Sequence, residues 1–338
     1  MDLNGATPTP GRPLTIWVVS DGRAGIENQA LGLAEAVARR VAAEIICKQI
    51  AWPVWMRRAP SRLMPGLRGL LARGAEALAP PWPDLWIANG RASIPLSIAV
   101  RRWSGGQTFV VQMQDPVRPA RLFDLVIPPA HDKLSGPNVF AITGTPHRVS
   151  EGRLEEGRKA FADSLAALPR PRVAALIGGK ARAYDLSPRR AETMADDIER
   201  AIRACGGSLM LTFSRRTPAR ARDILQQRLS GLPGMIWNDQ GPNPFFGFLG
   251  YADAVLVTED SANMPAEAAA TGAPVYMLAM DGGQPRRRQF LDDLARRGVT
   301  RPFEGRIESW AYAPLKETER AAEEVLMRMS ARRQAQRW

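Results

Sequence analysis

The segment from Tyr251 to Leu278 constrains the fold most, because it contains the patterns of a strand, a turn, a helix and a second strand in succession. The apolar run Ala254–Val257 has the length and β-branching of a strand buried in a parallel sheet. The Ala-rich run Ala262–Thr271 predicts a helix, which Gly272 ends in a left-handed conformation. With a second strand at Val275–Leu278, the segment predicts a βαβ unit whose helix starts at the ligand-binding edge of the sheet.

Polar side chains surround the start of this helix. Ser261 or Asn263 is expected to cap it, and Pro265 is tolerated because it falls in the first turn. Ser261 and Glu267 are six residues apart, which places the carboxylate about one and a half turns beyond the hydroxyl. This spacing suits a diphosphate at the helix start and a ribose diol beside the helix. The alternative is an ordinary cap and a solvated glutamate.

The composition predicts a globular protein with an acidic partner. A length of 338 residues allows two domains, and the net charge of +12 suits nucleotide diphosphates, an anionic membrane surface or nucleic acid. Nucleic acid ranks last, because the nine Trp residues follow no RNA-binding pattern. Cys47 and Cys205 form no metal or redox spacing, and no apolar window is long enough to span a membrane. We expect a cytoplasmic protein that binds peripherally to the inner membrane.

The rest of the chain repeats the alternation of strand, polar turn and helix. A disordered tail is expected at 1–13, a Rossmann-like acceptor-side domain at 14–150 and a connecting helix at 151–170. A donor-nucleotide domain at 171–312 and a C-terminal helix at 313–338 follow. The expected strands before the connecting helix are Leu14–Ser20, Glu44–Ile50, Asp84–Asn89, Thr108–Met113, Asp124–Ile127 and Asn138–Ile142.

The turns of the first half provide the candidate acceptor-side residues. The turn after the first strand has two glycines, which allow close backbone approach, but it lacks the G-x-G-x-x-G dinucleotide pattern. Polar groups follow it at the start of the next helix. The acceptor-side candidates are Gly22, Arg23, Gly25, Asn28, Gln29, Asn89, Gly90 and Arg91.

The turns of the second half provide basic and glycine-rich donor candidates. Gly178, Gly179 and Lys180 follow a strand but do not complete a P-loop, so an ATPase is not expected. Ser214, Arg215 and Arg216 follow the next strand, and guanidinium forks match phosphate oxygens. A loop at 279–289 with glycines, three arginines and two amides precedes a helix expected from Phe290.

The region from Trp52 to Arg73 alternates large apolar residues with arginines. It fits a peripheral membrane patch in which apolar groups enter the lipid and arginines reach phosphates. It equally fits a loop and helix that cover the core, with solvated arginines.

Several motifs together resemble a known family. They are SDGRAGIENQALGL at Ser20–Leu33, NGR at Asn89–Arg91, QDP at Gln114–Pro116, IGGK at Ile177–Lys180, TFSRRTP at Thr212–Pro218 and TEDSANMPAEAAATGAPVY at Thr258–Tyr276. The chain resembles the mitochondrial-fission ELM-type family, a set of proposed glycosyltransferases found in bacteria and plants. The resemblance implies an α/β, GT-B-like fold of two facing Rossmann-like domains with parallel sheets and a C-terminal helix that crosses back.

A more distant similarity is to the peptidoglycan N-acetylglucosaminyltransferase, which uses a lipid acceptor. It implies that Glu267 holds the donor ribose, that Gln289 contacts the donor sugar, and that Gly22 and Gly25 lie in the acceptor-side loop. The other donor-binding candidates of the central segment are Asp260, Ser261, Asn263 and Met264. Where that enzyme has a histidine, this chain has Ile26.

A general base must therefore come from another residue, and the candidates are Asp21, Asp115 and Glu27. Two functions follow. One is a metal-independent transferase without a cofactor, which moves a sugar from a nucleotide-diphosphate donor to a lipid-linked or glycan acceptor at the membrane face. The other is a non-catalytic membrane-associated scaffold on the same fold. The Ser261/Glu267 pair favours the enzyme.

Overall fold

The computed structural model describes residues 12–56, 69, 71–72 and 75–335. The contacts divide the chain into two units, 1–142 with 318–338, and 143–317. The expected tail lies almost wholly outside the described residues, as do Arg57, Arg58, Arg68 and Arg73 of the proposed membrane patch. The segment 151–170, which we expected to connect two domains, groups with the second unit.

The first unit is built on a parallel sheet, which has five strands in the order β2-β1-β3-β4-β5 within the described residues. The strands are β1 (Leu14–Ser20), β2 (Ala43–Gln49), β3 (Leu85–Ala88), β4 (Phe109–Met113) and β5 (Leu125–Ile127). The helices are α1 (Ala24–Ala38), α2 (Ile94–Trp103) and α10 (Glu317–Ala335), and short 3-10 turns are η1 (Val54–Met56), η4 (Ala120–Leu122) and η5 (Ala130–Asp132).

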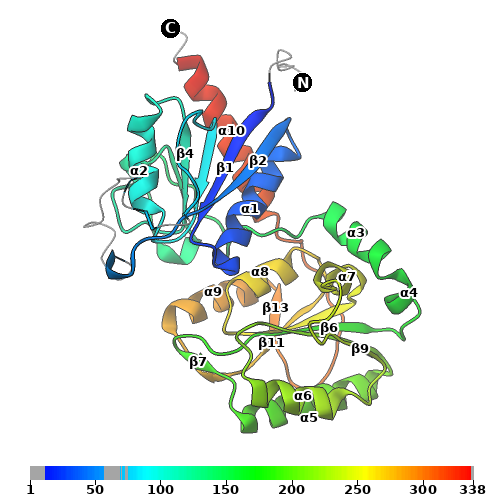
Figure 1. The fold of residues 1–338 in the computed structure, drawn as a ribbon. Helices are drawn as coiled ribbons and strands as arrows, with labels where there is room; N and C mark the ends of the chain where they lie inside the picture. The colour runs from blue at the N-terminus through cyan, green and yellow to red at the C-terminus, as the bar shows by residue number, and fades with distance from the viewer. Residues whose placement is uncertain (1–11, 57–68, 70, 73–74, 336–338) are drawn as a thin grey trace. The chain divides into compact units, whose positions relative to one another are not determined.

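Helices cover both faces of this sheet because its strands are apolar on both sides. Ile16 and Val18 of β1 pack with residues of α1 and α10, whereas Trp17 and Val19 pack with residues of α2. Figure 1 shows α1 and α2 on opposite sides of the sheet. The first unit is therefore a three-layer α/β structure.

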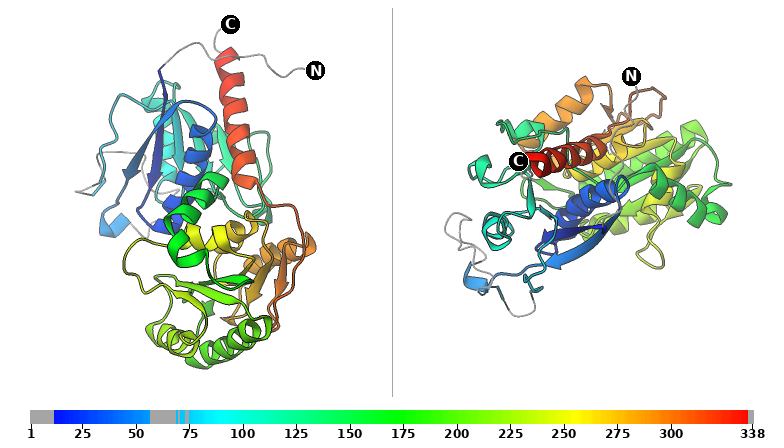
Figure 2. Two further views of the ribbon diagram at one scale, coloured as in Figure 1. Left: turned by 90° about the vertical axis from the view of Figure 1, so that its right-hand side faces the viewer. Right: turned by 90° about the horizontal axis from the view of Figure 1, so that it is seen from above.

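The last long helix, α10, belongs to the first unit although the whole second unit precedes it in the sequence. Ala321, Ala322, Val325 and Met329 of α10 are buried against strand residues of the first sheet. Figure 2 shows α10 lying along the first unit in both views. The expected C-terminal helix that crosses back is thus confirmed.

The second unit contains a larger parallel sheet, with the strand order β13-β11-β10-β6-β8-β9 within the described residues. Its strands are β6 (Arg172–Ile177), β8 (Ser208–Phe213), β9 (Gly234–Ile236), β10 (Ala254–Thr258), β11 (Val275–Leu278) and β13 (Thr300–Pro302). Its helices are α3 (Glu151–Ala160), α4 (Ala162–Leu165), α5 (Pro188–Cys205), α6 (Ala219–Leu229), α7 (Phe245–Tyr251), α8 (Asn263–Ala269) and α9 (Pro285–Arg296).

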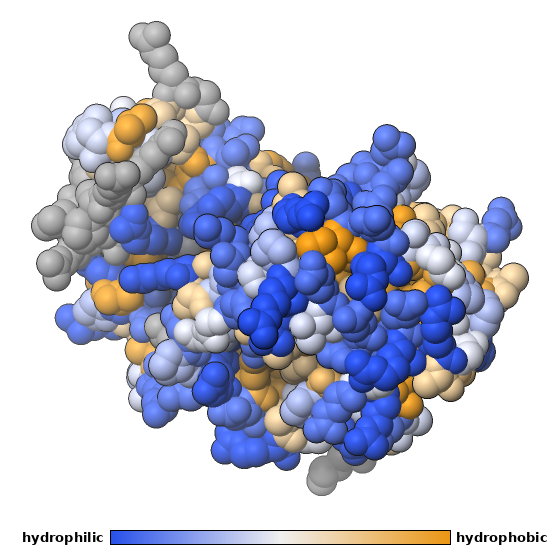
Figure 3. All heavy atoms as spheres, turned by 90° about the horizontal axis from the view of Figure 1, so that it is seen from below, coloured by the Kyte–Doolittle hydropathy of each residue, from blue (hydrophilic) through white to orange (hydrophobic). Residues whose placement is uncertain are grey.

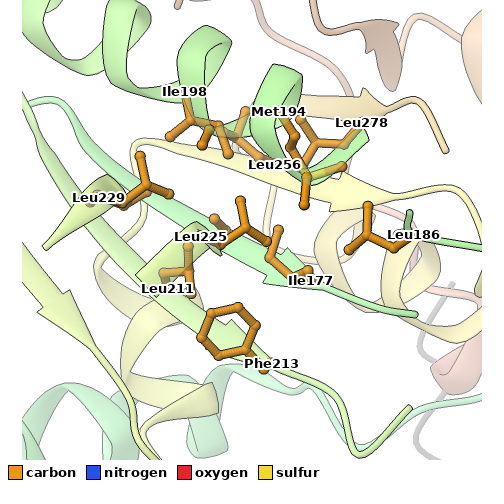
Figure 4. Close-up of a cluster of buried hydrophobic side chains, with 14 of the residues drawn as sticks. Ile177, Leu186, Met194, Ile198, Leu211, Phe213, Leu225, Leu229, Leu256 and Leu278 are labelled. Carbon is orange, nitrogen blue, oxygen red and sulfur yellow. The ribbon is translucent and has the colours of Figure 1, made fainter. Parts of the chain in front are cut away.

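One hydrophobic core of this unit lies between the sheet and the pair α5 and α6, and a second lies between the other face of the sheet and α3, α4 and α7. Figure 4 shows Met194 and Ile198 of α5 with Leu256 of β10, all buried. The outer side of α5 is charged, with an ion pair between Arg203 and Glu199 at 2.9 Å. Figure 3, seen from the side of α5 and α6, shows a mostly hydrophilic surface. Burial of one apolar face and exposure of one charged face fix these helices on the sheet.

An expected strand and an expected helix are both interrupted in the structure. The expected strand Asn138–Ile142 forms only the isolated bridges Val126↔Val139 and Pro129↔Ile142, because Pro128, between the donors Val126 and Ala130, lacks the N–H group that a continuous ladder needs. The expected single helix over 151–170 is broken into α3 and α4, since Phe161 leaves the helical conformation at φ −118° and ψ 20°.

A small antiparallel pair was not predicted. Strands β7 (Tyr184–Asp185) and β12 (Asp281–Gly282) pair with each other and fix the loop after β11. The helix expected from Phe290 starts earlier, because Pro285 occupies a first-turn position where its fixed φ favours the helix. The arginine-rich part of the expected loop is therefore the start of α9.

Candidate functional site

Each sheet has a topological switch point. This is a pair of neighbouring strands from which the chain continues toward opposite edges of the sheet. In the second unit the chain runs from β6 to β8 and β9 on one side, and then from β10 to β11 and β13 on the other. In the first unit the switch lies between β1 and β3. Ligands of doubly wound sheets bind in the crevice outside the carboxyl ends of the strands at such points. The predicted glycine-rich turns follow β6, β1 and β3, so they lie at the two switch points.

Asp260 organises the switch point of the second unit. Its side chain is fully buried, and its Oδ1 accepts a 2.8 Å hydrogen bond from Thr258 Oγ1. Its Oδ2 accepts bonds from Gly179 N at 3.3 Å and from Arg216 Nη2 at 2.6 Å. Thr258 Oγ1 also accepts from Gly178 N at 2.7 Å. One carboxylate thereby joins the turns after β6, β8 and β10.

The two glycines after β6 are required by close packing. A Cβ on Gly178 would lie 1.9 Å from Asp260 Oδ1, and one on Gly179 would lie 2.1 Å from the carbonyl oxygen of Arg216. Real Cβ atoms do not approach that closely, so any side chain here would displace the carboxylate or the neighbouring turn.

The turn after β8 presents its cations outward. Ser214 Oγ accepts from Arg216 N at 3.1 Å, and Arg216 O accepts from Lys180 N at 2.9 Å. Arg215 and Lys180 are exposed, and the Arg216 side chain is 45% exposed although it binds Asp260. The structure thus brings together Gly178, Gly179, Arg216 and Asp260, and it places Lys180 and Arg215 at their border.

The N-cap residue of α8 is Ala262, and the side chain of Ser261, one residue earlier, bonds the first amides of the helix. Ser261 Oγ accepts from Asn263 N at 3.2 Å and from Met264 N at 3.3 Å. Asn263 Oδ1 accepts from Thr145 Oγ1 at 3.1 Å, so this side chain is fixed within the second unit. The Ser261 hydroxyl still has a proton that it can donate to a ligand.

Glu267, on α8, is the most unusual carboxylate of the second unit. Its side chain is only partly exposed, and the loss of surrounding water raises its pKa from 4.5 to about 7. Among the described residues, no group forms a hydrogen bond or an ion pair with it. A desolvated carboxylate without a donor is costly unless a ligand supplies one.

Arg287, near the start of α9, is a residue that the sequence analysis did not single out. Desolvation lowers the pKa of Arg287, and the charges of Tyr184 and Asp260 partly oppose this effect. Its Nε is buried without a hydrogen-bond partner. Gln289, the predicted sugar contact, lies two residues further along α9 and is exposed.

The first-unit switch point combines an ion pair with a tight turn. Arg23 Nε donates to both carboxylate oxygens of Asp21 at 3.0 Å. Gly22 has φ +75°, and a Cβ there would lie 2.0 Å from Gln49 Nε2. The left-handed turn therefore favours glycine here, and a side chain would also displace the end of Gln49.

Side-chain amides, two of them buried, join the other turns of this unit. Asn89 Nδ2 donates to Gln29 Oε1 at 2.8 Å and to the Ile26 carbonyl at 3.0 Å. Gln114 Nε2 donates to Gln29 Oε1 at 3.1 Å. A Cβ on Gly90, at φ +86°, would lie 3.2 Å from Ile26 Cγ2. The predicted residues Gln29, Asn89 and Gly90 thus form one cluster, to which the structure adds Gln114.

A cavity of about 490 Å³ lies beside this switch point. Asp21, Arg23 and Arg91 contribute charged groups to it, and Trp52 contributes an indole. The size is within the range of small-molecule sites. Gln49, Ile50, Ala51 and Ala92 complete its lining.

The other first-unit candidates lie on α1 or on the loop after β4. Gly25, Glu27 and Asn28 belong to the first turns of α1, and no described residue forms a hydrogen bond or ion pair with the side chain of Glu27. Asp115 Oδ1 accepts from Val117 N at 2.8 Å, which stabilises the loop after β4. The described residues contain no group of three or more His, Cys, Asp or Glu that could hold a metal ion. Within the same residues, no helix is long and apolar enough to cross a membrane.

Solved structures share this architecture. The UDP-GlcNAc 2-epimerase of Methanocaldococcus jannaschii superimposes with a TM-score of 0.56 at 11% identity, covering 94% of this chain and all of that chain. The UDP-GlcNAc 2-epimerase of Neisseria meningitidis, solved bound to UDP-GlcNAc, gives 0.51 at 12%, covering 95% and 100%. The chain therefore has a GT-B-like α/β fold with two parallel sheets, which confirms the predicted fold class.

Relatives identify the family. The family model described as mitochondrial fission ELM1 matches residues 24–329. The mitochondrial fission protein ELM1 of Arabidopsis thaliana is 31% identical over 293 residues, which cover 79% of this chain and 68% of that protein. The chain belongs to the mitochondrial fission ELM1 family.

Proposed function

We propose that the protein is a glycosyltransferase that binds a nucleotide-diphosphate sugar in its second unit and a sugar acceptor in its first. The observation that carries the proposal is Glu267, a desolvated carboxylate without a partner among the described residues, on the helix next to the Asp260 cluster. The two hydroxyls of a ribose would supply the donors that this carboxylate lacks.

The position of the cluster supports the same ligand. It lies at a switch point where glycine turns permit close backbone approach and Arg216 offers a partly exposed guanidinium. Two solved structures with this fold hold UDP-GlcNAc, and one of them also holds UDP. The fold supports the ligand class more than the reaction, because epimerases and transferases both use it.

The acceptor is assigned to the first-unit cavity. Asp21 and Arg23 lie side by side there, so that one group accepts and the other donates hydrogen bonds to a polyhydroxylated or anionic acceptor. We propose Asp21 as the general base, with Asp115 second and Glu27 as an orienting group. Activation of the acceptor hydroxyl by a carboxylate would compensate for the isoleucine at position 26.

The experiment that tests the function is a thermal-shift screen of the full chain against UDP-, GDP-, ADP- and TDP-sugars. At a ligand concentration 100 times Kd, binding stabilises the folded state by about 2.7 kcal/mol, so at least one sugar nucleotide should raise Tm by several degrees. Free sugars and nucleosides serve as controls. If none of the sugar nucleotides changes Tm, the donor proposal is wrong.

A second candidate is a non-catalytic scaffold at a membrane surface. The relative from Arabidopsis thaliana carries the name of a fission protein, and the described part of the membrane-patch region exposes Val54 at 76% and Trp55 at 75%. Exposed apolar side chains next to arginines suit an anionic lipid surface.

The membrane candidate predicts binding to anionic liposomes that weakens steeply with salt. Changing four arginines of the patch region to Gln should remove most of it: Arg57, Arg58, Arg68 and Arg73. A control with the same loss of charge changes four exposed arginines of the second unit, Arg182, Arg189, Arg203 and Arg220. Equal cosedimentation of both variants with vesicles would refute the patch.

A further inference from the structure

The electrostatics around Asp260 leave one positive charge in excess. Arg216 already forms a 2.6 Å ion pair with this carboxylate. Arg287 is attracted to the same carboxylate and repelled by Arg216. The one buried anion near Arg287 is thus already paired with Arg216, and a second anion would relieve the repulsion between the two guanidiniums.

The position of Arg287 is fixed by the fold. The β7/β12 pair holds the loop before α9, where Gly283 N donates to the Ala183 carbonyl at 2.7 Å. Tyr184 Oη accepts from Gln284 N at 3.4 Å, at the residue that precedes α9. Arg287 is therefore held in a partly desolvated position, and within the described residues it forms no hydrogen bond and no ion pair.

We propose that Arg287 and Arg216 together form a cradle for a pyrophosphate group. A guanidinium in such a position is normally paired, and its fork matches two phosphate oxygens. The inference rests on the proposed donor function and deepens it, because it assigns the pyrophosphate to this pair and the ribose to Glu267. The cradle should therefore bind inorganic pyrophosphate without nucleoside or sugar.

The test is calorimetric titration of the full chain with inorganic pyrophosphate and with UDP. Arg287→Gln should weaken the binding of both at least tenfold. Arg288→Gln, a change to the exposed neighbour on the same helix, should alter neither by more than twofold. Glu267→Gln should weaken UDP binding and leave pyrophosphate binding unchanged.

Folding is checked by the Tm measured without ligand. The Tm of Arg287→Gln should not be lower than that of the wild type, because a desolvated and unpaired charge destabilises the folded state and the variant lacks it. If the glutamine variant does not fold, Arg287→Lys is the test of the cradle. Lysine keeps the positive charge but lacks the two parallel N–H donors of the guanidinium, so pyrophosphate should bind several-fold more weakly. Wild-type affinity for pyrophosphate in the folded variant would overturn the cradle. If the wild-type protein binds UDP but not pyrophosphate, the cradle is wrong and the donor function stands. If it binds neither ligand, the donor function is wrong as well.

Discussion

Glu267→Gln should make the protein more stable above neutral pH and a weaker binder of UDP. The folded state raises the pKa of this carboxyl from 4.5 to about 7, so it holds the proton more tightly than the unfolded state does. Wild-type stability should therefore fall as pH rises from 4.5 to 7, by at most about 3 kcal/mol from this group. Glutamine does not titrate, so the stability of the variant should not fall over this pH range for this reason.

The measurement is Tm against pH for both proteins, with UDP affinity by calorimetry at pH 8. The Tm values should agree near pH 4.5 and separate above pH 7, with the variant higher. Loss of a charged hydrogen-bond partner should weaken UDP binding by about 1.5–3 kcal/mol, or 10- to 150-fold. Glu192→Gln, on the exposed side of α5, should change neither quantity. A variant with the UDP affinity of wild type would remove Glu267 from the donor site.

Asp21→Asn should lower turnover by about 10² to 10⁴ while donor affinity stays the same. A general base contributes a factor of this size, and Asp21 belongs to the unit that we assign to the acceptor. The measurement is donor consumption under saturating donor, with donor affinity titrated separately. Asp115→Asn and Glu27→Gln are measured beside it, and Glu44→Gln on the exposed side of β2 is the control.

The pattern of losses decides among the three carboxylates. A large loss of turnover in Asp115→Asn, with no loss in Asp21→Asn, would make Asp115 on the loop after β4 the general base. Wild-type turnover in all three variants would exclude every carboxylate we named. A wild type that binds donor but never consumes it would support the scaffold.

The regular part of the fold could be predicted because its signals are local. Three strands lie where the apolar runs predict them: β1 and β11 have the expected bounds, and β10 extends one residue beyond the expected Ala254–Val257. The positive φ of Gly22 and Gly272 agrees with the predicted turn and helix end. Such features depend on neighbouring residues alone, so a single sequence contains them.

The chemistry of the site depends on contacts that sequence spacing does not encode. The run Arg286–Arg288 could not show which guanidinium is desolvated, because that depends on the β7/β12 pair and on Asp260. Asp260 itself was chosen as a donor ligand, but the structure shows that it holds three turns together. The amide cluster of Gln29, Asn89 and Gln114 joins residues that lie up to 85 positions apart. Partners at such distances are set by strand order and not by local pattern.

The return of α10 to the first unit has a consequence for synthesis on the ribosome. Residues 143–317 emerge with every strand of their own sheet, so this unit can close as soon as they leave the exit tunnel. The first sheet emerges earlier but must wait, with the surface that receives Ala321, Val325 and Met329 uncovered, until the later unit has been translated. The part of the protein that is made first is therefore completed last, and until then α1 is the only one of the two helices of this cluster that can cover the surface.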